Sequence, residues 1–154
     1  MNIWVDADSC PKDIRRIIER AANKRKIPSY FVANRAIPLH ITRYVFSIIC
    51  DNSDQAADRY ILENVSKLDL VITRDIPLAK QLVDLGVKTI NDRGTEFTPN
   101  DINTRLSIRN FMYELQSAGL SPEKTSTFNK KDVQNFAARF DTILNKALKA
   151  VSKH

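Results

Sequence analysis

Short apolar runs alternate with longer stretches of helical periodicity over residues 1–97. The short runs are rich in β-branched and aromatic side chains, which favours strands; they cover residues 2–5, 29–33, 44–49, 68–73 and 87–90. The run at 68–73, LDLVIT, is nearly continuous, as expected of a strand that is covered on both faces.

Three helices are predicted between these strands. The first, over residues 12–26, has apolar residues at helical spacing: Ile14, Ile17, Ile18, Ala21 and Ala22. Ser53 or Asp54 can cap the second helix, which carries apolar residues at 56, 57, 60, 61 and 65. The third has Asp75 at its start and Gly86 just past its end.

The last third of the chain has a helical character. A helix capped by Thr98 is predicted to run to Gly119, and residues 120–129 are predicted to form a loop or hinge. The final helix, over residues 130–151, has one apolar stripe: Val133, Phe136, Ala137, Phe140, Leu144, Ala147, Leu148 and Val151. Such a stripe needs a partner, so we expect it to pack on the rest of the chain or on a second copy in a homodimer.

The order of these elements is β-α-β-β-α-β-α-β, which is typical of an α/β fold with helices on the faces of a sheet. We expect one domain over residues 1–154, with an α/β core at 1–97 and a helical C-terminal part at 98–154. The three glycines form no GxGxxG or Walker A pattern, so nucleotide binding through those motifs is not expected.

Composition narrows the class of protein. The chain has 154 residues, of which 43% are hydrophobic, and this is enough to build a core without disulfides. No apolar run approaches the roughly 20 residues that cross a bilayer, and no signal-peptide pattern is visible. Two cysteines, Cys10 and Cys50, suit a reducing compartment. We therefore expect a cytoplasmic protein without a membrane segment.

The charge balance bears on partners. Twenty-four Lys and Arg against 18 Asp and Glu give a net charge of +6. Such a surplus favours polyanions such as RNA or DNA, although many basic proteins bind none. Arg93, Arg105 and Arg109 are candidate phosphate contacts, and solvated surface is the alternative reading for each.

Against this basic background, aspartates follow two of the predicted strands. Asp6 and Asp8 lie at the end of the first strand, and Asp75 follows the run that ends at Thr73. Ligands of open α/β sheets bind beyond the carboxyl ends of the strands. If both strands are central and parallel, these three carboxylates converge, and Asp58 could supply a fourth.

Carboxylates that lie close together repel one another unless a cation sits among them. Mg²⁺ prefers oxygen ligands and often binds through a few carboxylates, waters and substrate phosphates. A site of this kind can activate water for attack on a phosphoester. The pattern therefore predicts a Mg²⁺ or Mn²⁺ site for cutting nucleic acid.

Structural roles compete with this reading. Asp8 or Ser9 could cap the following helix, Asp75 could cap its own, and Asp58 could be a solvated helical residue. Cys10 has no histidine beside it in sequence, so it is read as a small buried group rather than as a nucleophile.

The motifs VDADSCP, DLVITRDIPLA and NDRG, together with RLSIRNFMYEL at 105–115, resemble the YaiI/YqxD family of uncharacterised bacterial proteins. The resemblance covers nearly the whole chain. It implies a PIN-like three-layer α/β/α sandwich, with a central, mostly parallel sheet, a C-terminal helical extension and an acidic metal pocket. Asp6, Asp8, Asp58 and Asp75 match the acids of that pocket, and Asp92 is not carried over.

Three functions follow as hypotheses. In a metal-dependent nuclease, Asp6, Asp8 and Asp75 would hold the metal and Asp58 would complete the pocket or position water. Ser9, Asn34 and Thr73 would be polar groups around these ligands or the phosphate. In a phosphatase of the haloacid-dehalogenase type, Asp6 would be the nucleophile. A non-catalytic module would bind nucleic acid through the basic face of residues 15–24.

Overall fold

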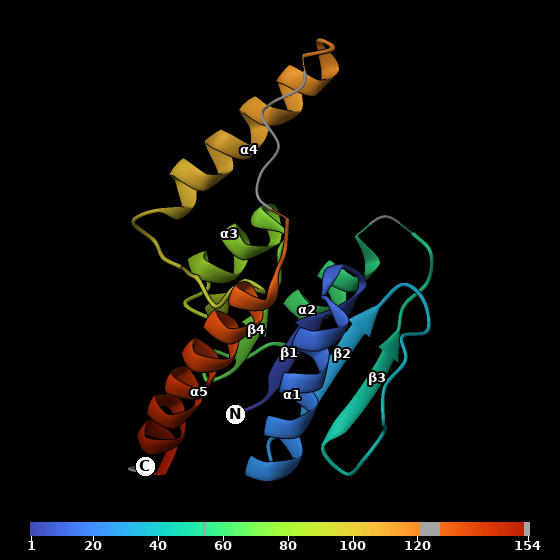
Figure 1. The fold of residues 1–154 in the computed structure, drawn as a ribbon, viewed down its shortest axis with the longest axis vertical. Helices are drawn as coiled ribbons and strands as arrows, with labels where there is room; N and C mark the ends of the chain where they lie inside the picture. The colour runs from blue at the N-terminus through green and yellow to red at the C-terminus, as the bar shows by residue number, and fades with distance from the viewer. Residues whose placement is uncertain (54, 121–126, 153–154) are drawn as a thin grey trace.

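The computed structural model describes residues 1–53, 55–120 and 127–152, with the backbone alone for 151–152. Its centre is a six-stranded sheet of order β3-β2-β1-β4-β5-β6 (Figure 1). The strands are β1 (Ile3–Asp6), β2 (Ser29–Ala33), β3 (Val45–Ile49), β4 (Leu70–Ile72), β5 (Lys88–Ile90) and β6 (Glu96–Phe97). All neighbouring strands are parallel except β5 and β6. The predicted α/β class with a mostly parallel sheet is confirmed.

The helices follow the expected order. They are α1 (Lys12–Arg25), α2 (Ala56–Asn64), α3 (Ile76–Asp84), α4 (Ile102–Ser117) and α5 (Lys130–Ser152). A single 3₁₀ turn, η1 (Ala7–Ser9), joins β1 to α1. Strands β2 and β3 are parallel neighbours, and residues 34–44, which connect them, contain no helix.

Helices cover both faces of the sheet. Alternate residues of β1 point to opposite faces, as in any strand. Ile3 and Val5 pack in the same buried cluster as α1 and α5 residues, whereas Trp4 packs with α2 and α3 residues such as Ile61 and Leu82. The result is the expected three-layer arrangement, in which β1 is covered on both sides.

The apolar stripe of α5 finds its partner within the chain. Phe136, Phe140 and Leu144 are at most 2% exposed, and they pack against α1 and the sheet. The packing requirement that suggested a homodimer is therefore met by the chain itself.

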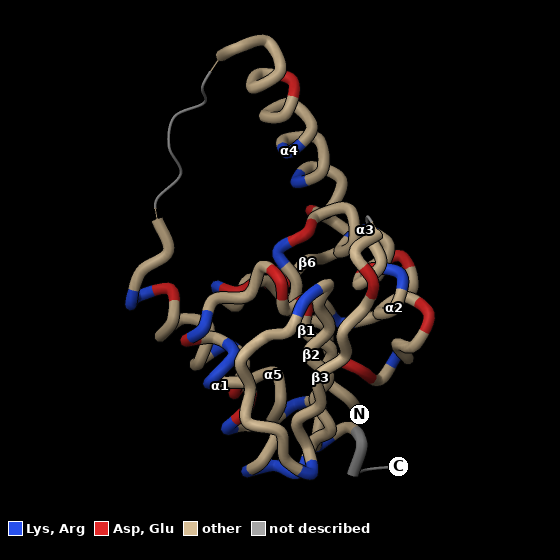
Figure 2. Tube along the Cα trace, turned by 90° about the vertical axis from the view of Figure 1, so that its right-hand side faces the viewer, with Lys and Arg blue, Asp and Glu red and all other residues tan. Residues whose placement is uncertain are grey.

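Helix α4 behaves differently, because it extends away from the sheet (Figure 1). Its first residue, Ile102, is buried against α3 and β6. Further along, large apolar side chains are 38–56% exposed: Ile108, Phe111, Met112 and Tyr113. Few of its residues are charged (Figure 2).

Two boundaries differ from the sequence prediction. Ser53 does not cap α2, because Gln55 occupies the N-cap with a left-handed backbone (φ 63°) and the Ser53 hydroxyl contacts Asp51 and Arg59 instead. Asp54 and most of the predicted loop at 120–129 lie outside the described residues.

Thr98 was predicted to cap α4, but the helix begins later, at Ile102, with Asp101 at the N-cap and no side-chain cap bond. Thr98 and Asp101 exchange hydrogen bonds, with Thr98 N donating to Asp101 Oδ1 at 2.9 Å and Asp101 N donating to Thr98 Oγ1 at 3.3 Å. This reciprocal pair has the pattern of a capping box but closes the turn that precedes the helix. Helical hydrogen bonding is regular only from Ile102.

No helix in the described part of the chain is long and apolar enough to cross a membrane.

Candidate acidic metal site

The sheet order places the predicted acids at one edge. Strands β1 and β4 are parallel neighbours, with Ile3 opposite Leu70 and Val5 opposite Ile72. Asp6 ends β1, and Asp75 precedes α3 just after β4. Asp8 lies in η1 and Asp58 in the first turn of α2. The chain therefore delivers four carboxylates to one region from four local structures.

These carboxylates line a common pocket of about 390 Å³. Its lining residues are Asp6, Asp8, Ser9, Asn34, Gln55, Ala57, Asp58, Arg74 and Asp75. Asp58 and Asp75 are close enough in this pocket for the charge of Asp75 to raise the pKa of Asp58.

Thr73 links two of the acids. Its hydroxyl donates to Asp6 Oδ2 at 2.9 Å and accepts from the backbone N–H of Asp75 at 3.0 Å. Thr73 is 2% exposed, so these bonds fix the angle at which the β4–α3 connection meets β1. The hydroxyl therefore orients the Asp6 carboxylate and the Asp75 backbone, and Thr73 is not among the residues that line the pocket.

The structure shows which of the predicted helix caps are formed. Helix α1 has Pro11 at its N-cap and no side-chain cap bond, so neither Asp8 nor Ser9 caps it. Asp8 Oδ2 instead accepts from the backbone N–H of Asn34 at 2.8 Å, which ties η1 to the end of β2. Asp75 does cap its helix, because its Oδ1 accepts from Leu78 N at 3.0 Å. It also lines the pocket, so it serves both purposes.

Burial and mutual repulsion disturb the ionisation of two acids. Asp6 is 8% exposed, and its burial, opposed by the Thr73 hydrogen bond, raises its pKa to about 6; Asp75 and Asp8 add to the rise. Burial raises the pKa of Asp58 to about 7, with further increases from the charges of Asp75 and Asp6. A bound cation would favour the ionised form of both carboxyl groups and would therefore lower both pKa values.

The donor set suits a hard cation that keeps part of its water. In the described part of the chain, no three His, Cys, Asp or Glu side chains are grouped closely enough to hold one ion directly. Mg²⁺ commonly takes only one or two carboxylates and retains waters. Asn34 Oδ1 is buried, and no donor among the described residues reaches it. A water or ligand in the pocket would satisfy that oxygen.

The remaining sequence candidates fall into three places. Ser9 and Asn34 line the acidic pocket, while Arg93 and Arg105 line a neighbouring one. Arg109 lines neither pocket and stacks on the Tyr113 ring at 4.3 Å, further along α4.

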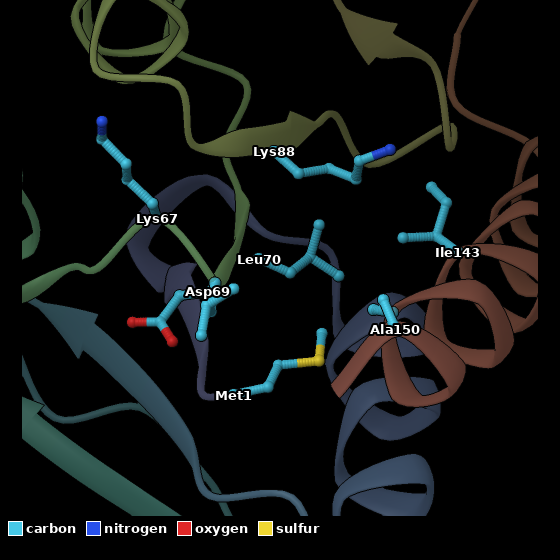
Figure 3. Close-up of a pocket in the computed structure, with 9 residues that line it drawn as sticks. Met1, Lys67, Asp69, Leu70, Lys88, Ile143 and Ala150 are labelled. Atoms are coloured by element: carbon cyan, nitrogen blue, oxygen red, sulfur yellow. The ribbon is translucent and has the colours of Figure 1, made fainter. Parts of the chain in front are cut away.

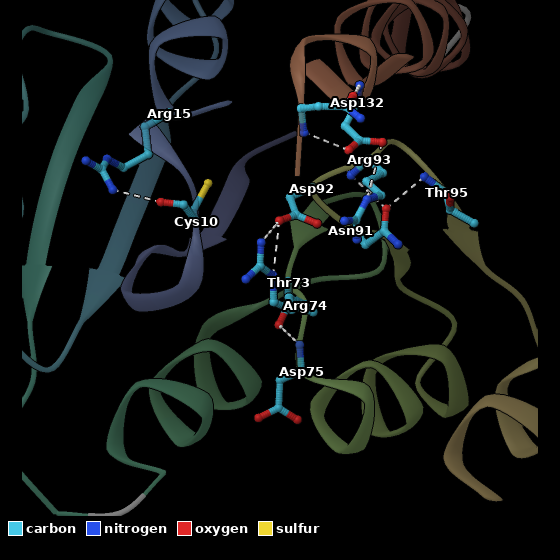
Figure 4. A network of polar contacts seen from close by, with 11 residues as sticks. Cys10, Arg15, Thr73, Arg74, Asp75, Asn91, Asp92, Arg93, Thr95 and Asp132 are labelled. Atoms are coloured by element: carbon cyan, nitrogen blue, oxygen red, sulfur yellow. Dashed lines mark hydrogen bonds and ion pairs between the residues drawn. The ribbon is translucent and has the colours of Figure 1, made fainter. Parts of the chain in front are cut away.

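Sequence reasoning missed Arg74, which lines both pockets. Its guanidinium pairs with the buried Asp92 (Figure 4). The position between Thr73 and Asp75 was the only signal that could have pointed to it. Cys10 is buried with its pKa raised to about 12, chiefly by burial, which agrees with a structural role.

A separate apolar cavity of about 240 Å³ lies at the opposite edge of the sheet, between α5 and the starts of β4 and β5 (Figure 3). Asp69 is the acid in its lining, and its carboxylate accepts bonds from Asn2 N, Trp4 Nε1 and Ser66 N at 2.8–3.0 Å. That carboxylate serves to hold the strand ends together. The acidic pocket is therefore the better candidate for chemistry.

A family model described as "Uncharacterized BCR, YaiI/YqxD family" matches residues 4–146. The chain belongs to the YaiI/YqxD family. A UPF0178 protein from Treponema denticola is 56% identical over 97% of this chain and 95% of the relative. UPF0178 proteins from Treponema pallidum and Geobacter metallireducens are 46% and 39% identical, each over 97% of this chain and over 84% and 96% of the relative. No solved structure matches the chain.

Proposed function

We propose that this protein is a metal-dependent nuclease that hydrolyses phosphodiester bonds of RNA or DNA. The observation that carries the proposal is the acidic pocket itself. Four carboxylates, from β1, η1, α2 and the N-cap of α3, line it, and burial and repulsion raise the pKa of Asp6 and Asp58. Burial and repulsion destabilise the ionised carboxylates of the folded protein, and a bound cation would offset this destabilisation. Acids with raised pKa values that line a pocket are therefore candidates for a functional site. The parallel sheet with acids at its carboxyl edge also supports a PIN-like placement.

The proposed roles follow from position. Asp6, Asp8 and Asp75 would hold Mg²⁺ or Mn²⁺, in part through waters that the ion retains, because no three such side chains in the described part of the chain are close enough to bind it directly. The ion would supply a Lewis acid and a more acidic bound water. Asp58 lines the same pocket, where burial and the charges of Asp75 and Asp6 raise its pKa to about 7. With a pKa near neutrality it can accept a proton from a water in the pocket. Thr73 holds the Asp6 carboxylate in place.

The phosphatase alternative receives less support. It needs an additional acid near Asp6, and Asp92 is the available residue after β5. Asp92 is 3% exposed, is bound by Arg74 and does not line the acidic pocket. Asp6, the required nucleophile, is itself only 8% exposed. Trapping a phospho-aspartate at Asp6 would nevertheless establish that chemistry.

The third hypothesis, a non-catalytic module that binds nucleic acid, predicts a different dependence on the aspartates. Its affinity for nucleic acid would survive the loss of the aspartates and would depend on the basic face of α1.

The two free cysteines, buried Cys10 and half-buried Cys50, support a reducing, cytoplasmic setting for either function.

The deciding experiment is cleavage of labelled single-stranded RNA and DNA with Mg²⁺, Mn²⁺ or chelator. The test variant is Asp75→Asn, since asparagine also caps helices and α3 should remain folded. The matched control is Asp84→Asn at the other end of α3, where Asp84 pairs with Lys80 on the surface. We expect metal-dependent cutting that is lost in Asp75→Asn and retained in Asp84→Asn. Equal cutting by all three proteins, or cutting in chelator, would contradict the proposal.

A further inference from the structure

A second pocket adjoins the acidic pocket at Arg74. It has a volume of about 450 Å³ and is lined by Arg74, Ile76, Asn91, Asp92, Arg93, Phe97, Arg105, Thr127 and Phe128. Because Arg74 lies directly between Thr73 and Asp75, it forms part of both linings. Figure 4 shows Arg74 and Asp92 next to Arg93, with the Asp75 carboxylate pointing away from them. We name this site the arginine pocket.

The arginine pocket brings together three guanidinium groups from separate parts of the chain. Arg74 follows β4, Arg93 lies between β5 and β6, and Arg105 lies in the first turn of α4. Each of these guanidinium groups contacts one carboxylate, which belongs to Asp92 for Arg74, to Asp132 for Arg93 and to Asp101 for Arg105; of these three acids only Asp92 is in the pocket lining. A ligand that enters therefore meets guanidinium groups that their partners already orient, rather than an excess of positive charge.

Two of these arginines are held in place by partners at the pocket edge. Arg74 is bound by Asp92 through Nε and Nη2. Arg105 Nε contacts Asp101 Oδ2 at 3.3 Å, and its guanidinium carbon lies 5.4 Å from the centre of the Phe97 ring. A guanidinium has five N–H donors, so one contact through Nε leaves Arg105 able to donate to a ligand.

The turn that carries Arg93 is equally fixed. Asn91 Oδ1 accepts from the backbone N–H groups of Arg93 and Thr95 at 2.9 and 3.0 Å. Gly94 has φ +81°, and a Cβ there would lie 2.8 Å from Arg139 Cβ on α5. The close approach requires glycine and locks the turn against α5. Arg93 Nε then meets Asp132 at 3.3 Å, with Phe128 below its guanidinium.

Oriented guanidinium groups of this kind are typical of phosphate recognition, because their planar donors match two oxygens at once. A stacked base is the less suitable occupant, since Arg105 and Arg93 already cover the rings of Phe97 and Phe128. We propose that the arginine pocket binds a backbone phosphate of the nucleic-acid strand, next to the phosphodiester that lies in the acidic pocket.

This inference rests on the proposed function and sharpens its substrate. A strand whose scissile bond is flanked by another phosphate would contact both pockets across Arg74. A small phosphomonoester would occupy only one of them. The substrate class is therefore an oligonucleotide or polymer rather than a single nucleotide.

The test measures binding, so it does not depend on cleavage. Labelled hexauridylate and hexathymidylate are titrated with the full chain at several salt concentrations, with Ca²⁺ and again with chelator, and anisotropy is recorded. The variants are Arg105→Gln, Arg105→Lys and the double variant Arg93→Gln/Arg105→Gln. The control is Arg43→Gln, which removes an exposed arginine that also lies over an aromatic ring, Tyr44, but at the amino end of β3. Circular dichroism confirms that each variant is folded.

We expect each lost guanidinium to weaken binding about tenfold and to reduce the salt slope by about one. Arg105→Lys should restore the salt slope but only part of the affinity, because lysine cannot bind two oxygens at once. Arg43→Gln should bind as the unaltered chain does. Equal effects of Arg43→Gln and Arg105→Gln, or no binding of either oligonucleotide by the unaltered chain, would overturn the inference.

A matched substrate series separates this proposal from the nuclease itself. Oligonucleotides with one neutral methylphosphonate at successive positions should lose affinity when the neutral group flanks the scissile position, and this loss should disappear in the double variant. Metal-dependent cleavage that is insensitive to both changes would leave the nuclease standing and reject the phosphate site. Arginine-dependent binding without cleavage would do the reverse.

Discussion

Replacing Asp6 by asparagine should stabilise the metal-free protein. Asp6 is 8% exposed, and burial, with smaller contributions from Asp75 and Asp8, raises its pKa from 3.8 to about 6. The folded protein therefore holds the Asp6 proton more tightly than the unfolded chain does. As pH rises from about 4 to about 6, the unfolded chain releases this proton first, and the free energy of unfolding falls.

The size of the effect follows from the shift. A difference of about two pKa units at about 1.4 kcal/mol each gives a cost of about 3 kcal/mol above pH 6, against less than about 1 kcal/mol at pH 4. Asparagine does not titrate, and its Oδ1 can still accept from the Thr73 hydroxyl. Asp6→Asn should therefore exceed the original protein in stability by up to about 3 kcal/mol at about pH 8 and by little at pH 4.

The assay is urea unfolding followed by circular dichroism in chelator at about five pH values between about 4 and 8. Asp84→Asn serves as the control, because it makes the same chemical change on the surface of α3 and should give a small difference at every pH. If Asp6→Asn is as stable as or less stable than the original protein near pH 8, burial and repulsion do not act on Asp6 as argued.

Three further predictions concern the cation and the fold. Millimolar Mn²⁺ should raise the melting temperature of the original protein and shift Asp6→Asn less, since a ligand stabilises only the state that binds it; equal shifts in differential scanning fluorimetry would contradict the assigned site. Gly94→Ala should lower the free energy of unfolding in urea by about 2 kcal/mol or more, and Gly86→Ala by about 1 kcal/mol. Both glycines have positive φ, but only at Gly94 do other atoms lie where a Cβ would be. Equal losses would refute this reasoning. Phe140→Ala should destabilise by about 3–5 kcal/mol, and a loss below about 1 kcal/mol would show that α5 is not part of the core.

The sequence was most informative where local pattern and burial agree. The run SYFVA became β2 with no change of boundary, and the helix expected over 12–26 ends one residue earlier, at Arg25. The acids after β1 and β4 were predicted to converge because parallel strands end at the same edge. That prediction needed only the strand directions, which the structure provides.

Features that depend on distant contacts were not visible in the sequence. Strand β6 has two residues and pairs with β5 only after a tight turn, which leaves too short an apolar pattern to detect. Arg74 pairs with Asp92, which lies 18 positions further along the chain, and Arg74 lines both the acidic pocket and the arginine pocket. Neither contact is visible in the local sequence. The cap at Ser53 was wrong because Gln55 adopts a left-handed backbone, which propensity does not favour.

The most direct test of the central claim is calorimetric titration of the purified protein with Mn²⁺ near neutral pH. Asp8→Asn removes one pocket carboxylate and Asp84→Asn removes one outside it. The account predicts saturable Mn²⁺ binding with proton release, strongly weakened in Asp8→Asn and unchanged in Asp84→Asn. Binding that Asp8→Asn leaves intact, or no binding at millimolar Mn²⁺, would contradict the claim that these four aspartates form a cation site.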